Sequence, residues 1–289
     1  MFGEKIYPEY LSPEELDEYL NQGWYRQGQS IFTTHFLFFH GGLYSAIWIR
    51  QDLEGFKFRK SNRRVLRNCH HNFQVSYGPL KMTEEKEALY QVYRNSFPGI
   101  LTPSLKESLF EEYNTNVYNS WEVCLRDGQK LIAYSIFDLG KSSLASIVGV
   151  YDPAYQKFSP GYSTMLLEVQ YGLENGLKWF YPGYIVPGNT RFDYKIRIGA
   201  TESYDLGTKT WIPTADFLSR ELPVDLIHRK LAELADFLSQ KEIPSFLFAN
   251  LLLEANFYSL EDIEFLDAPH FLLLYPETEK REFAIVTYN

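Results

Sequence analysis

The turn pair Asp127-Gly128 separates two short stretches, 121–126 and 130–137, that are rich in apolar and aromatic residues. An Asp-Gly pair adopts the positive backbone angles of a two-residue hairpin turn, and strands of this composition pair readily on either side of it. A third stretch with strand character, 144–150, follows directly. The sequence therefore predicts an antiparallel hairpin that is extended by one further strand.

A helix and another strand follow this unit. Between 160 and 175, apolar side chains recur at helical spacing at Tyr162, Met165, Leu166, Val169 and Leu173. Gly176 ends this helix, and 177–181 returns as a strand. Hairpin, strand, loop, helix and strand is the core order of GNAT-type N-acyltransferases, and strand-helix-strand units also occur in many other α/β domains. We predict an α/β (α+β) fold with a mixed central sheet.

The N-terminal part mixes helices and strands. Ser12 and Glu15 flank Pro13 as a capping box does, which predicts a helix up to about Asn21. Stretches 30–39 and 43–49 predict a hairpin, 73–77 predicts a strand, and 83–95 and 104–113 predict helices.

The C-terminal part has a different pattern. An apolar stripe follows Pro223, and Pro244 opens a second segment that is rich in Leu and Phe, so two helices are expected. We therefore divide the chain into an N-terminal α+β region (1–115), a GNAT-like catalytic core (116–213) and a mainly helical C-terminal extension (214–289).

One short segment carries positive charge in an otherwise acidic chain. The net charge is -9, yet the segment between residues 57 and 67 has no acid and six cations, which are Lys57, Arg59, Lys60, Arg63, Arg64 and Arg67. Such a cluster forms either a solvated basic face or a phosphate-binding surface. From the charge pattern alone, a solvated basic face is the favoured interpretation.

Composition narrows the class of protein. Cys69 and Cys124 are the only cysteines, too few for a disulfide framework or a cysteine-based metal site. The run Cys69-His70-His71 is read as a strand whose adjacent side chains diverge, so no metal site is expected. No apolar run of membrane-spanning length and no signal peptide are evident, which predicts a cytoplasmic protein without a membrane partner.

Several motifs, in order, resemble the aminoacyl-tRNA-protein transferases, the arginyl- and leucyl-transferring enzymes of the N-degron pathway. The motifs are 20-LNQGWYRQGQSIFTT-34, 45-SAIWIR-50, 61-SNRRVLRN-68, 83-TEEKEALYQVYRNSF-97, 151-YDPAYQKFSPGYS-163 and 180-FYPGYIVPGNTRFDYK-195. The resemblance covers roughly 16–213. It implies transfer of Arg or Leu from a charged tRNA to proteins that begin with Asp or Glu, without a cofactor.

The resemblance also implies site residues. Asp152 would orient the attacking amine or accept its proton, and Tyr194 and Lys195 would position the tRNA terminus or donate to the oxyanion. The implied substrate-binding residues are Arg59, Lys60, Arg63, Arg64, Arg67, Ser159, Gly161, Tyr184 and Arg191. Arg191 or Lys195 would alternatively grip the acidic side chain of the acceptor. Without the resemblance, Asp152 is equally well explained as a turn former and Tyr194 as a half-buried ring.

The chain also departs from the family pattern. Where family members carry a cysteine cluster linked to a metal cofactor, this chain has 34-THFLFF-39. The acid that the family places midway along the helix after the glycine loop corresponds here to Gln170 or Tyr171. A degenerate member that binds tRNA or peptides without turnover is therefore an alternative. An acyl-CoA-dependent acyltransferase is less favoured, because Pro160 removes a backbone amide from the loop that would hold pyrophosphate.

Overall fold

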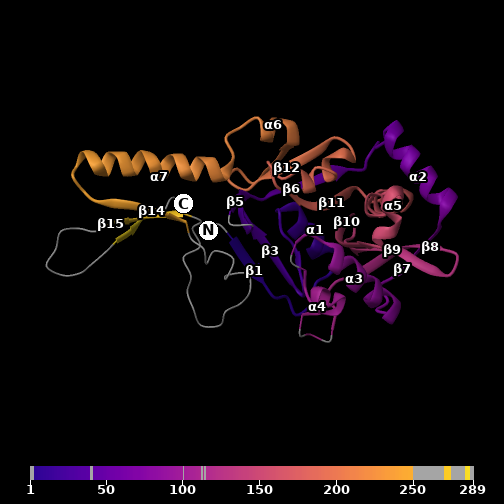
Figure 1. Ribbon diagram of the computed structural model, residues 1–289. Helices are drawn as coiled ribbons and strands as arrows, with labels where there is room; N and C mark the ends of the chain where they lie inside the picture. Colours follow the sequence, from indigo (N-terminus) through magenta and orange to yellow (C-terminus); the bar gives the residue numbers. More distant parts are fainter. Residues whose placement is uncertain are drawn as a thin grey trace.

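The computed structural model describes residues 3–39, 42–99, 101–111, 113, 115–249, 270–274 and 284–286 (Figure 1). Its centre is an eight-stranded sheet with the strand order β13-β12-β6-β11-β10-β9-β8-β7. The strands are β6 (Ile47–Asp52), β7 (Gln74–Pro79), β8 (Ser120–Asp127), β9 (Lys130–Leu139), β10 (Ser143–Tyr151), β11 (Trp179–Ile185), β12 (Thr201–Asp205) and β13 (Thr210–Pro213).

The predicted core order is confirmed. Strands β8 and β9 form the hairpin around Asp127-Gly128, and β10 adds to β9 in antiparallel orientation. Helix α5 (Pro160–Glu174) then leads back to β11, which lies parallel to β10. Gly176 has a φ of 68° after this helix, as a helix-ending glycine requires. The result is the mixed sheet that the sequence predicted.

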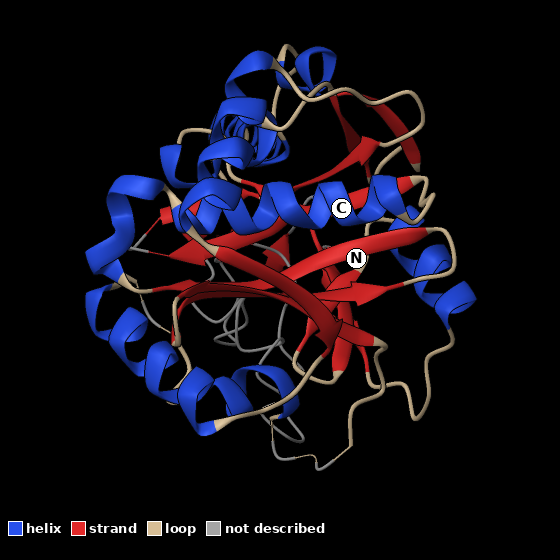
Figure 2. Ribbon diagram, turned by 90° about the vertical axis from the view of Figure 1, so that its right-hand side faces the viewer, coloured by secondary structure: helices blue, strands red, loops and turns tan. Residues whose placement is uncertain are grey.

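Helices cover both faces of the sheet (Figure 2). Helix α5 packs on one face, where Ala133 and Phe137 of β9 contribute to its core. On the other face, Tyr134 and Ile136 pack with α3 (Glu84–Ser96) and α4 (Leu105–Phe110). Alternate side chains of β9 thus serve opposite cores, because successive residues of a strand point to opposite faces.

Helix α2 (Lys60–Asn72) packs against α5, on the α5 side of the sheet (Figure 1). Asn62, Leu66 and Cys69 are its buried residues. This helix contains most of the basic segment, for which the sequence indicated no secondary structure, and Lys57 and Arg59 precede it. The 3-10 helices η1 (Pro153–Phe158), η2 (Thr190–Phe192) and η3 (Lys195–Arg197) connect the larger elements.

The N-terminal region confirms some predictions and corrects one. Helix α1 (Pro13–Asn21) begins with the predicted capping box, in which the Ser12 and Glu15 side chains each accept from the other's backbone amide. The predicted hairpin forms only in its central part, between 36–39 and 42–45. The outer parts of the two stretches, beyond His35 and Ala46, pair with other strands. Strand β3 (Ser30–Thr34) pairs with β1 (Gly3–Ile6) and β2 (Tyr25–Gln27), β4 (Phe36–Phe39) pairs with β5 (Gly42–Ser45), and β6 joins the central sheet.

The C-terminal part contains the first predicted helix, α7 (Pro223–Gln240), preceded by the short α6 (Thr214–Leu218). The prediction of a helix that begins at Pro244 is wrong, because the next residues form strand β14 (Ser245–Ala249). This strand pairs with β15 (His270–Leu274), and β15 pairs with β16 (Ala284–Val286). Residues 250–269, which the same prediction covered, lie outside the described residues.

Candidate active site

The parallel strands β10 and β11 separate partway along their length. They pair only where Ser143, Leu144 and Ala145 face Trp179, Phe180 and Tyr181. Beyond this point the register of β10 is irregular between Ser146 and Val148, and that of β11 between Phe180 and Gly183. Pro182, within the second irregularity, has no amide to donate. The sheet therefore opens at this place.

Tyr25 of β2 lies at the point of separation. Its hydroxyl is within hydrogen-bond reach of the carbonyl oxygen of Ser146 on β10 and lies 3.0 Å from that of Tyr181 on β11. The ring is stacked on Trp48 and is buried. The Tyr25 hydroxyl thus gives a hydrogen-bond partner to one backbone carbonyl of each strand, at the point where the pairing between β10 and β11 ends.

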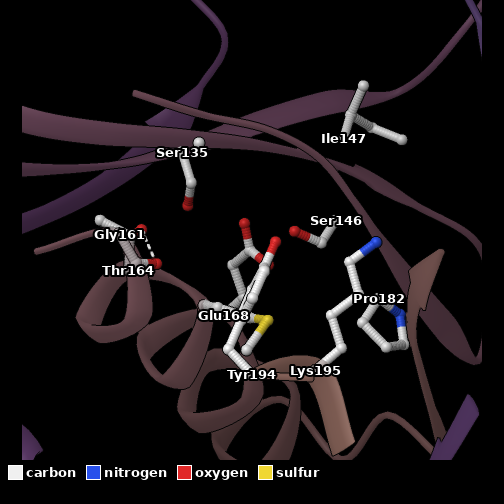
Figure 3. A pocket seen from close by; sticks show the side chains of 11 residues that line it. Ser135, Ser146, Ile147, Gly161, Thr164, Glu168, Pro182, Tyr194 and Lys195 are labelled. Carbon is white, nitrogen blue, oxygen red and sulfur yellow. Dashed lines mark hydrogen bonds between the residues drawn. The ribbon is translucent and has the colours of Figure 1, made fainter. Parts of the chain in front are cut away.

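A cleft of about 80 Å³ occupies the opening (Figure 3). Strands β9 and β10 supply Ser135, Ser146, Ile147 and Gly149, β11 supplies Pro182, α5 supplies Gly161, Thr164, Met165 and Glu168, and the segment after β11 supplies Tyr194 and Lys195. Polar and titratable groups thus meet three apolar side chains in a small, partly enclosed space. This combination is typical of a site that orients a substrate and changes its charge.

Glu168 is the most unusual group of the cleft. Its side chain is completely buried, and among the described residues neither carboxylate oxygen has a hydrogen-bond partner. Burial raises the pKa of Glu168 to about 8, although the neighbouring hydroxyls of Ser135 and Ser146 partly oppose this shift. The carboxyl therefore exchanges a proton near neutral pH, as a general base must.

Tyr194 and Lys195 line the cleft from the segment after β11, and the ring of Tyr194 lies beside Glu168 (Figure 3). Burial lowers the pKa of Lys195 to about 7, and its Nζ donates to the carbonyl oxygen of Tyr184 at 2.9 Å. Burial, and next the charge of Glu168, raises the pKa of Tyr194 to about 12, although 39% of this residue remains exposed. At neutral pH the phenol is therefore a hydrogen-bond donor, and the amine is partly uncharged.

The basic helix face consists of Arg59, Lys60, Arg63, Arg64 and Arg67. Four of these residues have the i, i+3, i+4, i+7 spacing that places side chains on one side of a helix, and all five are exposed. Within the described part of the chain none of them has an acidic partner. The cations are therefore available to an external anion.

The structure brings only some predicted site residues together. Gly161, Tyr194 and Lys195 line the cleft, whereas Asp152 does not. Asp152 follows β10 and caps η1: its Oδ1 accepts from the amide of Ala154 at 2.9 Å, and its Oδ2 lies 2.7 Å from Nζ of Lys130. Its side chain therefore has a structural role in a turn.

The predicted residues Ser159, Tyr184 and Arg191 do not line the cleft. Ser159 joins η1 to α5 with a left-handed backbone, at a φ of 54°, and Arg191 is exposed on η2. Tyr184 contributes a backbone carbonyl to Lys195, and its ring contacts Trp48 edge to face.

Glu168 was not among the predicted site residues. The resemblance placed the helix acid at Gln170 or Tyr171, but Gln170 contacts His70 of α2, at 3.3 Å, and the ring of Tyr171 lies beside Trp121. The signal was available: Glu168 stands alone among apolar residues, between Leu167 and Val169, at a helix position that the periodicity places in the core.

The reason given against a metal site at Cys69-His70-His71 was wrong. Cys69, His70 and His71 lie in the last turns of α2 and not on a strand, with Cys69 buried and both histidines exposed. In the described part of the chain, no group of three or more potential ligands could hold a metal ion. Likewise, no helix among the described residues has the length and apolar character needed to cross a membrane.

Comparison with known proteins adds to this geometry. The family described as "Arginine-tRNA-protein transferase, C terminus" matches residues 85–205, which include the whole cleft. An aspartate/glutamate leucyltransferase of Leptospira interrogans is 27% identical over 221 residues, or 74% of this chain and 84% of the relative. One from Helicobacter hepaticus is 27% identical over 183 residues, covering 62% of this chain and 74% of the relative.

Solved structures are more distant. The C-terminal domain of a putative lysylphosphatidylglycerol synthetase from Agrobacterium fabrum has a TM-score of 0.42 at 14% identity, covering 58% of each chain. A GCN5-related N-acetyltransferase from Anabaena variabilis has a TM-score of 0.36 at 11% identity, covering 100% of this chain and 59% of the other.

Proposed function

Because the chain is related to the aminoacyl-tRNA-protein transferases, we propose that it transfers an amino acid from the 3′ end of a charged tRNA to the N-terminal amine of proteins that begin with Asp or Glu. Leucine is the favoured amino acid. The two relatives described above are named leucyltransferases. In addition, Ile147, Met165 and Pro182 give the cleft an apolar surface, which suits a leucine side chain. Arginine is the alternative, for which the buried carboxylate of Glu168 would offer a partner.

The observation that carries this proposal is the meeting of Glu168, Tyr194 and Lys195 in one cleft. The attacking α-amine must be uncharged, and a carboxylate whose pKa lies near that of an N-terminal amine is suited to take its proton. Glu168 meets this requirement, because its pKa is raised to about 8.

The reaction then needs no covalent bond between the enzyme and either substrate. The amine nitrogen attacks the ester carbonyl carbon, Tyr194 and Lys195 donate hydrogen bonds to the oxyanion, and the bond to the 3′ oxygen of the tRNA breaks. The proton taken up by Glu168 passes to that oxygen, so a hydroxyl leaves and the carboxylate is restored. Holding both substrates in line supplies much of the rate.

The basic helix face supports binding of the tRNA. Its five cations would neutralise phosphates of the acceptor stem, which gives salt-dependent binding with little reading of base sequence. Arg191, exposed on η2 three residues before Tyr194, would bind the acidic side chain of the acceptor.

A transfer assay tests the proposal. Radiolabelled leucine and arginine, each supplied on its tRNA, are offered to peptides that begin with Asp, Glu, Lys or Ala. We expect label from leucyl-tRNA on the Asp and Glu peptides only, and its loss in the Glu168→Gln variant. Salt-dependent tRNA binding without label on any peptide would instead identify a degenerate member.

A further inference from the structure

Asn62 joins the basic helix α2 to both walls of the cleft. It is 3% exposed, although the residues on either side of it are exposed. Its Nδ2 donates to the carbonyl oxygens of Ile198, at 2.9 Å, and Arg197, at 3.3 Å. Its Oδ1 accepts from the hydroxyl of Tyr162 on α5, at 3.1 Å. One buried amide thus fixes three elements relative to one another.

These contacts determine where Arg197 lies. Arg197 ends η3, two residues after Lys195, and its backbone is held against α2 through Asn62. Its side chain is exposed, and within the described residues it has no acidic partner. The chain therefore holds a free cation between the basic helix face and the cleft.

Arg59 approaches the same place from the N-terminal end of α2. Burial raises the pKa of the Tyr162 hydroxyl, while the positive charges of Arg197 and Arg59 lower it. Both guanidinium groups therefore act on one hydroxyl, from two different elements. They extend the positive charge of α2 toward the segment that carries Tyr194 and Lys195.

We propose that Arg197, positioned by Asn62, binds the phosphate backbone of the single-stranded 3′ end of the tRNA between the acceptor stem on α2 and the cleft. This inference rests on the proposed function and assigns a part of the tRNA to a residue outside the basic helix face. Arg197 is a binding residue. Asn62 is a positioning residue, because it acts through the backbone of the segment that carries Arg197.

Binding of two uncharged tRNAs tests the inference. One tRNA is intact, and the other lacks its single-stranded 3′ nucleotides. We expect Arg197→Ala to weaken binding of the intact tRNA about tenfold, as loss of one charge-assisted hydrogen bond does, and to lower the salt slope by about 0.7. Binding of the trimmed tRNA should not change.

Two further variants are matched controls. Arg63→Ala, on the basic helix face, should weaken binding of both tRNAs equally. Lys241→Ala removes an exposed cation after α7, at the end of the molecule opposite α2 (Figure 1), and should change neither. Because Lys241→Ala changes the net charge as much as Arg197→Ala does, it separates the effect of net charge from the effect of position.

Asn62 is tested by a double-mutant cycle. Asn62→Ala should weaken binding of the intact tRNA and not of the trimmed tRNA, and it should add nothing to Arg197→Ala. A thermal melt of each variant checks that it folds. If Asn62→Ala does not fold, Asn62→Ser, which keeps a short hydrogen-bonding side chain, replaces it in the same binding measurements.

The outcomes separate the two proposals. Equal losses for both tRNAs in Arg197→Ala, or no loss for either, would overturn the inference and leave the proposed function standing. If the wild-type protein bound neither tRNA, the proposed function and this inference would both fail.

Discussion

The Nζ atom of Lys195 lies 2.9 Å from the carbonyl oxygen of Tyr184, so the strand that forms one wall of the cleft holds the cleft lysine in place. Gly183 makes room for this contact. Its φ is 87°, and a Cβ atom built on it would lie 3.3 Å from Nζ of Lys195 and 3.5 Å from the ring of Tyr25. A glycine is therefore required here for its conformation and for its size.

We expect Gly183→Ala to lower stability and turnover together. The strained backbone costs about 1 kcal/mol, and the added methyl group crowds the cleft lysine. Gly128→Ala is the matched control, because Gly128 also has a positive φ, 59°, with nothing within 4 Å of its Cβ position. Denaturant unfolding should show similar losses for both variants, and the transfer assay a loss for Gly183→Ala alone. Equal activities would show that the cleft tolerates the methyl group.

Lys195→Met should change the pH dependence of stability. Burial lowers the pKa of the folded-state amine to about 7, from its ordinary value of 10.5. Between these values the unfolded chain binds one more proton, so this lysine makes stability rise with pH. The gain in stability from Lys195→Met should therefore be largest at pH 7 and shrink toward pH 9. The test is the free energy of unfolding of wild type and of Lys195→Met at both pH values. The same difference between the two proteins at pH 7 and pH 9 would show that Lys195 has an ordinary pKa.

Glu168→Gln should show the opposite trend. Burial raises the pKa of the folded-state carboxyl to about 8, from its ordinary value of 4.5, so between these values the folded state binds the extra proton. This group therefore lowers wild-type stability as pH rises through that range. Relative to wild type, the variant should gain stability from pH 5 to pH 8, and its transfer activity should be lost. A pH-independent difference would indicate that Glu168 has an ordinary carboxyl pKa.

Local chemistry explains which elements were predictable. The capping box at Ser12, the Asp127-Gly128 turn and the stripe after Pro223 each specify structure through neighbours in the sequence, and each element formed as expected. Strand β14 was misread because its exposed Phe and Leu side chains have no strict alternation, and only pairing with β15, which is distant in the sequence, makes them a strand.

The cleft was less predictable for the same reason. The motif residues that line it come from two neighbouring segments, and their resemblance to a family was visible in the sequence. The separation of β10 from β11, however, depends on irregularities that no short pattern indicates. Asn62 looks unremarkable in the sequence, because its importance comes from contacts with residues that are distant in the chain. Glu168 stands out as a lone acid among apolar residues, but only the fold shows that its carboxylate is buried without a hydrogen-bond partner.

Arg26 and Asp138 form a buried ion pair, at 2.9 Å, that ties β2 to β9. Arg26 also donates to the carbonyl oxygens of Gly28 and Leu109. Arg26→Met should destabilise the protein by about 3–5 kcal/mol, because it leaves Asp138 buried and unpaired. Combining it with Asp138→Leu should recover part of this loss. Denaturant unfolding measures both, and a loss below about 1 kcal/mol for the single variant would show that water replaces the guanidinium.

Asp152 offers the sharpest test of the sequence-based site. Its carboxylate caps Ala154 and pairs with Lys130, whose side chain is 58% exposed, and the hydrogen bond from Lys130 is the main cause of its lowered pKa. Asp152→Asn keeps a capping side chain and loses an exposed ion pair, so stability should fall by less than about 1 kcal/mol.

Because this carboxylate does not line the cleft, transfer by Asp152→Asn should stay within about threefold of wild type, whereas loss of a proton-transferring group costs about a hundredfold or more. Asp152→Ala, which also removes the cap, should lower stability further without a matching loss of turnover. If kcat fell by two orders of magnitude in the folded Asn variant, Asp152 would act on the substrate as the resemblance implied, and the turn around η1 would have to move when both substrates bind.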